Sequence, residues 1–234
     1  MAWLTRLCEL LFVPTCGACD TPLQRSGSGL CDTCMLSVCE LGPSCPHCAE
    51  PLTGADSLLC SRCRGTPPVY TTILSPYRYG GQLGEALRTL KYNNRPDIAR
   101  TLAPLISPMV EAAARACDLV IPLPLHRKRH CQRGFNQSQL LATYARPGVP
   151  IDTLSLRRVR ETPAQSSLTA AARASNVAGA FAVRGWRRKH IVGRTILLVD
   201  DVVTTGATMN AAATALRDAG ATAVVGFCVA RAQF

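Results

Sequence analysis

The sequence predicts a mostly parallel α/β sheet that follows a small cysteine-rich module, and three observations carry this prediction. Ten of the 13 cysteines precede Arg64. Beyond that point, β-branched and apolar runs alternate with amphipathic segments, which is the pattern of strands joined by crossover helices. One run, Thr195–Val199, is continuously apolar, as expected for a parallel strand covered on both faces. We therefore expect a cysteine module over residues 1–66 and an α/β domain over residues 67–234.

The cysteine module is an internal repeat. Cys16–Cys34 and Cys45–Cys63 align with a constant offset of 29 residues, and in each half eleven residues separate two Cys-x-x-Cys pairs. Two such turns supply four thiolates to a tetrahedral zinc ion and leave no open position, so the site is structural. The sequence predicts two zinc ribbons, with Cys39 and His47 as competing ligands and a redox-active pair as the alternative. The predicted ligands are Cys16, Cys19, Cys31 and Cys34 in one ribbon and Cys45, Cys48, Cys60 and Cys63 in the other.

The α/β domain is predicted element by element from its periodicity. Leucines at helical spacing predict one helix over Gly80–Tyr92, and Pro96 with Asp97 predicts the start of a second. The remaining predicted strands are Val69–Leu74, Leu119–Leu125 and Thr222–Val229, and the remaining helices are Ser138–Ala145 and Gly206–Ala219. Met1–Phe12 is predicted to be a docking helix, because its apolar residues recur at helical spacing and no secretory signal is present.

The segment after Val199 is the predicted ligand site, because parallel sheets bind ligands beyond the carboxyl ends of their strands. It is interpreted as a loop of two acids, two valines and a Thr/Gly-rich run that enters a helix: Asp200, Asp201, Val202, Val203, Thr204, Thr205, Gly206, Ala207 and Thr208. Carboxylates at a strand end hold ribose hydroxyls or act through Mg²⁺. Hydroxyls and backbone N–H groups at a helix N-terminus hold a phosphate. Together they predict a ribose-5-phosphate site.

This run resembles the type I phosphoribosyltransferase signature. The rest of the chain is similar to the ComF family, which includes competence-associated proteins and proteins named GntX. The similar segments are Pro122–Pro124, Arg133–Gln137, Gln165–Leu168 with Arg173 and Asn176, and the run after Val199, all behind a zinc-ribbon module. The resemblance implies a phosphoribosyltransferase-type fold that binds phosphoribosyl pyrophosphate (PRPP) with magnesium.

The resemblance also implies roles for individual residues. Pro122, Leu123 and Pro124 are expected to face the pyrophosphate, and Arg133–Gln137 to lie in or near a mobile loop that closes over it. Lys91 is expected to reach the phosphates from upstream. Asp200 and Asp201 are the candidate catalytic residues. Phosphoribosyltransferases usually carry an additional segment, the hood, that recognises the base or amine acceptor. We identify no separate hood in the sequence, so the acceptor is left open.

Charge is concentrated in one segment. Between Val120 and Thr195 there are 14 Lys or Arg and 2 acidic residues, whereas the rest of the chain has 12 Lys or Arg and 13 acidic residues. Such a stripe suits a polyanion, although a solvated basic face is the alternative. The predicted nucleic-acid contacts are Arg127, Lys128, Arg129, Arg133, Arg187, Arg188 and Lys189, with Phe135, Tyr144 and Trp186 as candidate stacking residues.

Two functions are compatible with these features. The first is a PRPP-binding zinc-ribbon protein that handles single-stranded DNA with DNA-uptake proteins, as the ComF resemblance implies. The second is a catalytic phosphoribosyltransferase, a pentosyltransferase acting on an unidentified acceptor. No apolar stretch reaches the ~18 residues of a membrane span and no secretory signal is present, so a cytoplasmic location is expected. In that reducing compartment the 13 cysteines are not expected to form disulfides.

Overall fold

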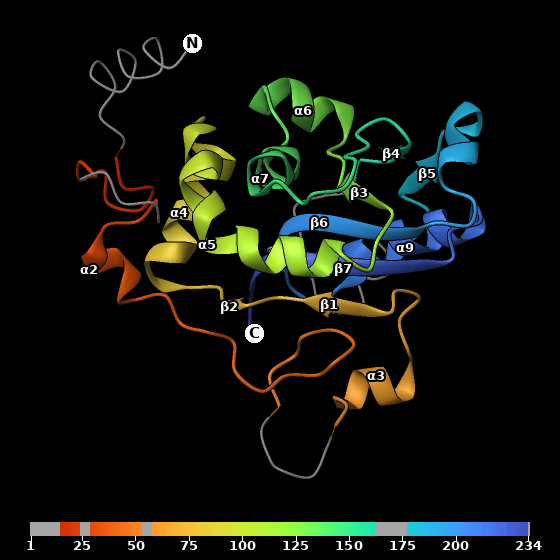
Figure 1. Ribbon diagram of the computed structural model, residues 1–234, viewed down its shortest axis with the longest axis horizontal. Coiled ribbons are helices and arrows are strands. Elements are labelled where there is room, and N and C mark those ends of the chain that lie inside the picture. The colour runs from red at the N-terminus through yellow and green to blue at the C-terminus, as the bar shows by residue number, and fades with distance from the viewer. Residues whose placement is uncertain (1–14, 24–28, 53–57, 162–176, 234) are drawn as a thin grey trace.

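The computed structural model describes residues 15–23, 29–52, 58–161 and 177–233 (Figure 1). The predicted helix over residues 1–12 lies outside these ranges, and so do Gln165–Leu168, Arg173 and Asn176. Among the helices that are described, none has the length and apolar character needed to cross a lipid bilayer.

The predicted parallel sheet is confirmed. Its strands follow the spatial order β1–β7–β6–β3, and β2 also pairs with β7; every pairing is parallel. The strands are β1 (Thr72–Leu74), β2 (Tyr77–Arg78), β3 (Leu119–Pro122), β6 (Thr195–Val203) and β7 (Ala223–Arg231). Because all run the same way, their carboxyl ends meet at one edge, where a ligand site is expected.

Helices cover both faces of the sheet (Figure 1). Leu197 packs into one core cluster with the buried residues of α4 (Gly81–Tyr92), α5 (Asp97–Ala114) and α7 (Gln137–Ala145). Leu198 packs into the other with those of α9 (Ala207–Asp218). Neighbouring residues of a strand point to opposite faces, so the continuous apolar run of β6 fills both clusters.

The central strand is longer than predicted. The sequence interpretation ended it at Val199, but β6 continues through Val203, so the first four residues assigned to the ligand loop belong to the strand. Asp200 lies opposite Cys228, and Val203 lies opposite Arg231, both in β7. The two β-branched valines favour extended backbone, and β7 supplies hydrogen-bond partners beyond the apolar run. The pair of aspartates therefore sits on a rigid strand end.

Smaller elements complete the chain. The helices are α2 (Asp32–Met35), α3 (Ser61–Gly65), α6 (Arg127–Arg133) and the 3₁₀ helix η2 (Gly185–His190). An antiparallel pair that the sequence did not predict is formed by β4 (Leu156–Arg158) and β5 (Phe181–Val183). Arg133–Gln137 does not form a long loop. Gly134, with a φ of 78°, ends α6, and Asn136 begins α7 by accepting a hydrogen bond from the backbone N–H of Ser138.

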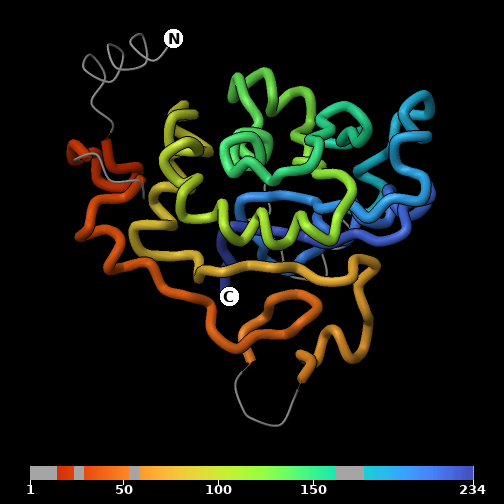
Figure 2. Tube along the Cα trace, viewed as in Figure 1, coloured from red at the N-terminus to blue at the C-terminus, as the bar shows by residue number. Residues whose placement is uncertain are grey.

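The two ribbons pack against different parts of the α/β domain. Figure 2 shows the red first ribbon beside α4 and the orange second ribbon beneath β1. Cys16 and Cys34 belong to the core cluster of α4 and α5, whereas Cys45, Cys48 and Cys63 belong to the cluster that contains α9. The backbone N–H of Ile73 in β1 donates to the carbonyl of His47 in the second ribbon. The cysteine module thus shares its hydrophobic core with the sheet.

Candidate functional site

The two cysteine quartets assemble as the sequence predicted. The four Sγ atoms of Cys16, Cys19, Cys31 and Cys34 lie within 4.8 Å of one another, and so do those of Cys45, Cys48, Cys60 and Cys63. The distance between the Sγ atoms of Cys19 and Cys31 is 3.6 Å, and that between Cys48 and Cys60 is the same. Four thiolates ~2.3 Å from a tetrahedral zinc ion would be about 3.8 Å apart, so both quartets fit zinc.

The competing ligands lie outside these quartets. The Nδ1 atom of His47 lies 2.9 Å from the carbonyl oxygen of Thr71, and the Cys39 thiol donates to the carbonyl of Ser37. Among the other cysteines in the described part of the chain, Cys117 and Cys228 are buried and Cys131 is exposed. The spacing of the internal repeat therefore predicted which four cysteines come together in each quartet.

The acidic pair lies at the carboxyl end of β6, held by two helices. Asp200 accepts hydrogen bonds from the Ser138 hydroxyl of α7 at 2.8 Å and from the backbone N–H of Asp201 at 2.9 Å. The Asp201 carboxylate is 2% exposed and lies 2.8 Å from the Nζ atom of Lys91 in α4. The sequence predicted Lys91 as a ligand of phosphate, and the structure places its ammonium against the acidic pair.

Burial and repulsion by the neighbouring carboxylate govern the ionisation of Asp200. Burial, and then the charge of Asp201, raise the pKa of Asp200 to about 7. Burial by itself lowers the pKa of Lys91, but the charge of Asp201, its hydrogen bond to Lys91 and the charge of Asp200 together outweigh burial, so the pKa of Lys91 is raised. A carboxyl pair of this kind at the end of a strand suits a cation such as Mg²⁺, or the hydroxyl groups of a ligand that donate hydrogen bonds to it.

The Thr/Gly-rich run forms the turn into α9. Gly206 adopts a φ of 78° as the N-cap, a conformation that favours glycine, and a Cβ atom there would lie 2.7 Å from the Tyr70 hydroxyl. The Thr205 hydroxyl accepts from the backbone N–H of Ala207 at 3.3 Å. The 12-residue helix α9 begins at Ala207, so its first N–H groups and its dipole suit an anion at this point.

One pocket of about 710 Å³ joins these features. From the predicted ligand set it is lined by Lys91, Leu123, Pro124, Arg133, Asp200, Asp201, Val202, Val203, Thr204, Gly206, Ala207 and Thr208. Pro122, the last residue of β3, and Thr205 do not line it. The pocket thus brings together the acids, the turn into α9, and upstream residues that include Arg133 of α6 and Lys91 of α4.

Several lining residues were missed by sequence reasoning. Arg158 in β4 reaches the pocket beside Arg129, and burial together with the charge of Arg129 lowers the pKa of Arg158. Tyr92 lies under the Arg133 guanidinium, which is 5.7 Å from the ring centroid. The excess of arginine between Val120 and Thr195 pointed to Arg158 but could not select it among the other arginines, and no sequence signal pointed to Tyr92. Crowded cations beside a phosphate-type turn favour a ligand with several negative charges.

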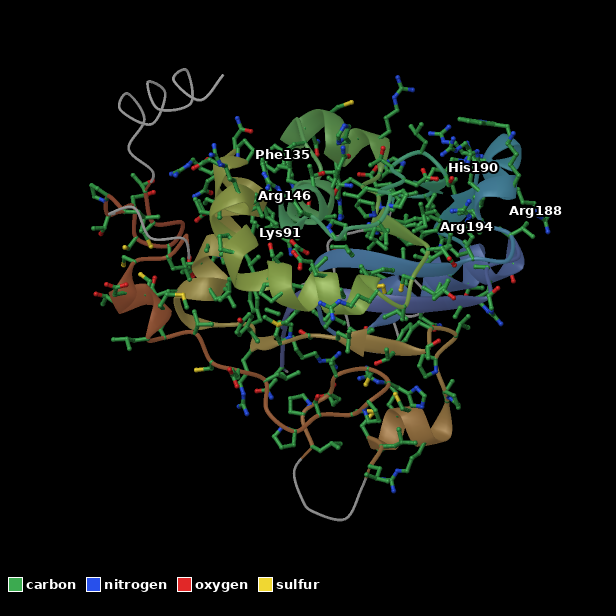
Figure 3. The ribbon with its side chains drawn as sticks, in the orientation of Figure 1. Lys91, Phe135, Arg146, Arg188, His190 and Arg194 are labelled. Atoms are coloured by element: carbon green, nitrogen blue, oxygen red, sulfur yellow. The ribbon has the colours of Figure 1, made fainter. Side chains whose placement is uncertain are left out.

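The predicted nucleic-acid residues do not form one surface. Arg129 and Arg133 line the pocket at the carboxyl edge of the sheet, and Arg127 and Lys128 lie with them on α6. Arg187, Arg188 and Lys189 lie on η2, which precedes the amino end of β6. Figure 3 shows Arg188, His190 and Arg194 at one end of the molecule and Lys91 and Phe135 toward the other.

Two arginines of η2 have partners within the protein. Arg187 donates to the Asp152 carboxylate at 2.9 Å, and this carboxylate is 4% exposed. Arg188 donates to the carbonyl of Ala219 at 3.2 Å. Among the candidate stacking residues, Trp186 is 65% exposed, with Arg187 over its ring at 5.4 Å from the centroid, whereas Phe135 packs against the core.

Comparison with known proteins agrees with this architecture. The family of phosphoribosyl transferase domains matches residues 133–233. The DNA utilization protein YhgH of Salmonella typhi is 36% identical over 95% of this chain and 99% of its own length. Competence protein F of Haemophilus influenzae is 32% identical over 73% of this chain and 77% of its own. Competence protein ComFC of Streptococcus pneumoniae is 34% identical over 47% of each chain. A chain that aligns with such relatives over nearly its whole length, and carries a phosphoribosyltransferase domain behind two cysteine quartets, belongs to the ComF family.

Proposed function

We propose that this protein binds PRPP with Mg²⁺ at the carboxyl edge of β6 and acts with single-stranded DNA during the uptake and use of DNA. The observation that carries the proposal is the pocket in which Asp200, Asp201 and the turn into α9 face Lys91 and Arg133. Each part of this pocket matches one part of PRPP.

The match can be followed along the ligand. The 5-phosphate would lie on the turn from Thr204 to Thr208, where hydroxyls and the N–H groups of α9 face the pocket. The ribose hydroxyls would lie against the acidic pair, which accepts hydrogen bonds when ionised. The pyrophosphate would lie toward Leu123, Pro124 and the cations of α4 and α6. Mg²⁺ would neutralise the pyrophosphate and share the charge of the carboxylates.

The DNA part of the proposal rests on relatives and on charge. Relatives that align over most of this chain are named for DNA utilization and competence. The segment between Val120 and Thr195 carries 14 basic and 2 acidic residues. Contacts between basic side chains and the phosphate backbone of DNA give salt-dependent binding with little sequence preference. The exposed Trp186 beside the exposed Lys189 offers a stacking face of the type used by single-strand binders.

The alternative is a catalytic phosphoribosyltransferase, and the domain match over residues 133–233 favours it. In that reaction a nucleophilic nitrogen of the acceptor forms a bond to C1 of the ribose while the bond to pyrophosphate breaks. Pyrophosphate leaves with the bonding electron pair, and its charge would be stabilised by Mg²⁺ and the pocket cations. The same residues support both functions, so the two are distinguished by whether an acceptor is consumed.

Calorimetric titration tests the ligand directly. Metal-loaded protein is titrated with Mg²⁺–PRPP and, separately, with ribose 5-phosphate. We expect PRPP to bind and the substitutions Asp200→Asn with Asp201→Asn to abolish binding, while Glu85→Gln, an exposed acid-to-amide change on α4, leaves it unchanged. The double variant is also measured with Lys91→Met added, because Asp201→Asn leaves the buried Lys91 ammonium without its carboxylate partner. Wild-type affinity in a folded double variant would place the ligand elsewhere and overturn the proposal.

A further inference from the structure

Arg62 connects the second cysteine quartet to the turn that precedes α9. This residue lies in α3 between the ligands Cys60 and Cys63. Its Nη1 atom donates to the carbonyl oxygen of Thr205 at 3.0 Å. Its Nη2 atom donates to Glu50 at 3.0 Å and lies 3.8 Å from the Sγ atom of Cys48. One guanidinium therefore contacts the phosphate-type turn, a carboxylate and a thiol of the quartet.

A second arginine closes this network from the sheet. Arg231, the last residue of β7, is 1% exposed and donates to the carbonyl oxygen of Cys48 at 2.8 Å and to the Glu50 carboxylate. In the sheet it lies opposite Val203, the last residue of β6. Glu50 thus bridges two arginines. Arg62 binds the turn at Thr205, and Arg231 lies opposite Val203, which directly precedes the same turn.

The chain that leaves the second quartet also lies against this turn. The Tyr70 side chain is 4% exposed, and its hydroxyl faces Gly206 so closely that a Cβ atom there would be 2.7 Å away. The backbone N–H of Val69 donates to the Asn210 side chain, in the first turn of α9, at 2.7 Å. Arg62 of the second ribbon and two residues of the segment that follows it therefore lie against the turn and the start of α9.

The direction of the Thr205 hydrogen bond has a functional meaning. A turn that presents N–H groups to an anion must direct carbonyl groups away from it, because a carbonyl oxygen facing the anion would repel it. Arg62 holds one such carbonyl outward with a charged donor, which is about twice as strong as a neutral one. A guanidinium anchored to a metal-held ribbon keeps this orientation better than a solvent-exposed side chain would.

The internal repeat shows that this connection is specific to the second ribbon. With the offset of 29 residues, Arg62 aligns with Thr33, and Glu50 aligns with Thr21. Neither threonine can replace the ionic network. The first ribbon packs instead against α4 and α5, where the Arg95 guanidinium binds Asp20 at 2.9 Å. The two ribbons therefore differ at the residues that reach the turn.

We propose that Arg62 is a positioning residue that couples metal binding at the second quartet to ligand binding at the turn before α9. The proposal rests on the proposed function, because the ligand in question is PRPP. Zinc at Cys45, Cys48, Cys60 and Cys63 fixes α3, α3 fixes Arg62, and Arg62 fixes the carbonyl of Thr205. By linkage, PRPP tightens zinc binding at this quartet by the same factor, and the first quartet is uncoupled.

Two measurements on the full-length, zinc-loaded protein test the coupling. Calorimetry is expected to show Mg²⁺–PRPP affinity at least about fivefold weaker in Arg62→Ala, within the usual range of coupling factors, and unchanged in Arg64→Ala, an exposed arginine of the same helix. A chromogenic chelator is expected to remove one of the two zinc ions more slowly when PRPP is saturating. This protection should persist in Arg64→Ala and disappear in Arg62→Ala.

The outcomes separate the coupling from the ligand assignment. Equal PRPP affinity in Arg62→Ala and wild type, or equal protection of both zinc ions, overturns the coupling. Failure of the wild type to bind PRPP overturns the proposed function instead. In that case, backbone hydrogen exchange of the ligand-free protein still tests Arg62. Faster exchange at Gly206–Asn210 in Arg62→Ala than in Arg64→Ala supports the positioning role, and equal exchange refutes it.

Discussion

The ion pair between Arg187 and Asp152 is predicted to be structural, although charge counting assigned Arg187 to nucleic acid. Asp152 also accepts from the Ser155 hydroxyl and from the backbone N–H groups of Leu154 and Ser155. Burial raises the pKa of this carboxyl, but these hydrogen bonds and Arg187 outweigh burial and lower the pKa from 3.8 to about 2. That difference corresponds to about 2.4 kcal/mol of stabilisation of the ionised form.

The sign of this effect fixes the pH at which it is measured. A carboxyl whose pKa is depressed in the folded state contributes its full stability above the unfolded pKa of 3.8 and loses it as the pH falls to about 2. The pair is therefore fully formed at pH 7.5, where thiolate ligands also retain zinc. Arg187 is one of four donors to Asp152, so Arg187→Ala is expected to lower the free energy of unfolding by about 1–2 kcal/mol.

Urea unfolding of zinc-loaded variants at pH 7.5 measures this loss. Arg187→Ala, Asp152→Asn and the double variant form a cycle whose coupling energy is expected to be about 1 kcal/mol. Lys189→Ala, an exposed change on the same 3₁₀ helix, is the control and should leave stability within about 0.5 kcal/mol. If Arg187→Ala left stability unchanged and weakened binding of an oligonucleotide, the structural assignment of Arg187 would be refuted.

Three further predictions concern metal, ligand and DNA. Elemental analysis should find two zinc ions per chain, falling to one in Cys34→Ser or in Cys63→Ser; fewer than one in the wild type would exclude the ribbons. Because the pKa of Asp200 is raised to about 7, Mg²⁺–PRPP affinity should fall about tenfold from pH 8 to pH 6, and a flat profile in calorimetry would contradict this role. In fluorescence anisotropy at two salt concentrations, Arg129→Ala and Arg188→Ala should each reduce the salt slope of single-stranded DNA binding by about 0.7, and unchanged slopes in both would remove these residues from the interface.

The sequence predicted the fold well because its strongest signals are local. A repeat of Cys-x-x-Cys pairs specifies its own ligand sets, and a continuous apolar run such as Thr195–Val199 specifies a central strand. The end of that strand was placed four residues too early because two acids interrupt the apolar run in the sequence. Their pairing with β7 is decided by the neighbouring strand, whose sequence lies more than 20 residues away.

The sequence pointed to the acids and the turn of the candidate site, but it did not point to the residues that hold them in place. The acids and the turn into α9 are contiguous, so their pattern is visible in the sequence. Ser138, which holds Asp200, and Arg62, which holds the carbonyl of Thr205, lie 62 and 143 positions from their partners. No local signal marks them, because a serine or an exposed arginine has the same appearance whether or not a distant backbone group folds against it.

The charge of the basic segment illustrates the same difference between sequence and space. The strand β6 separates η2 at its amino end from the pocket near its carboxyl end, and the stretch from Thr195 to Asp200 spans about 16 Å. This is about twice the Debye length of about 8 Å at physiological salt, so exposed charges at the two edges reinforce one another only weakly. The pocket cations would act on the ligand proposed to bind at Asp200, whereas Lys189 and its neighbours on η2 form a separate charged surface. An excess of 12 positive charges in one stretch of sequence is thus divided between two surfaces of lower charge. The salt dependence of binding at each surface is set by the counterions released there.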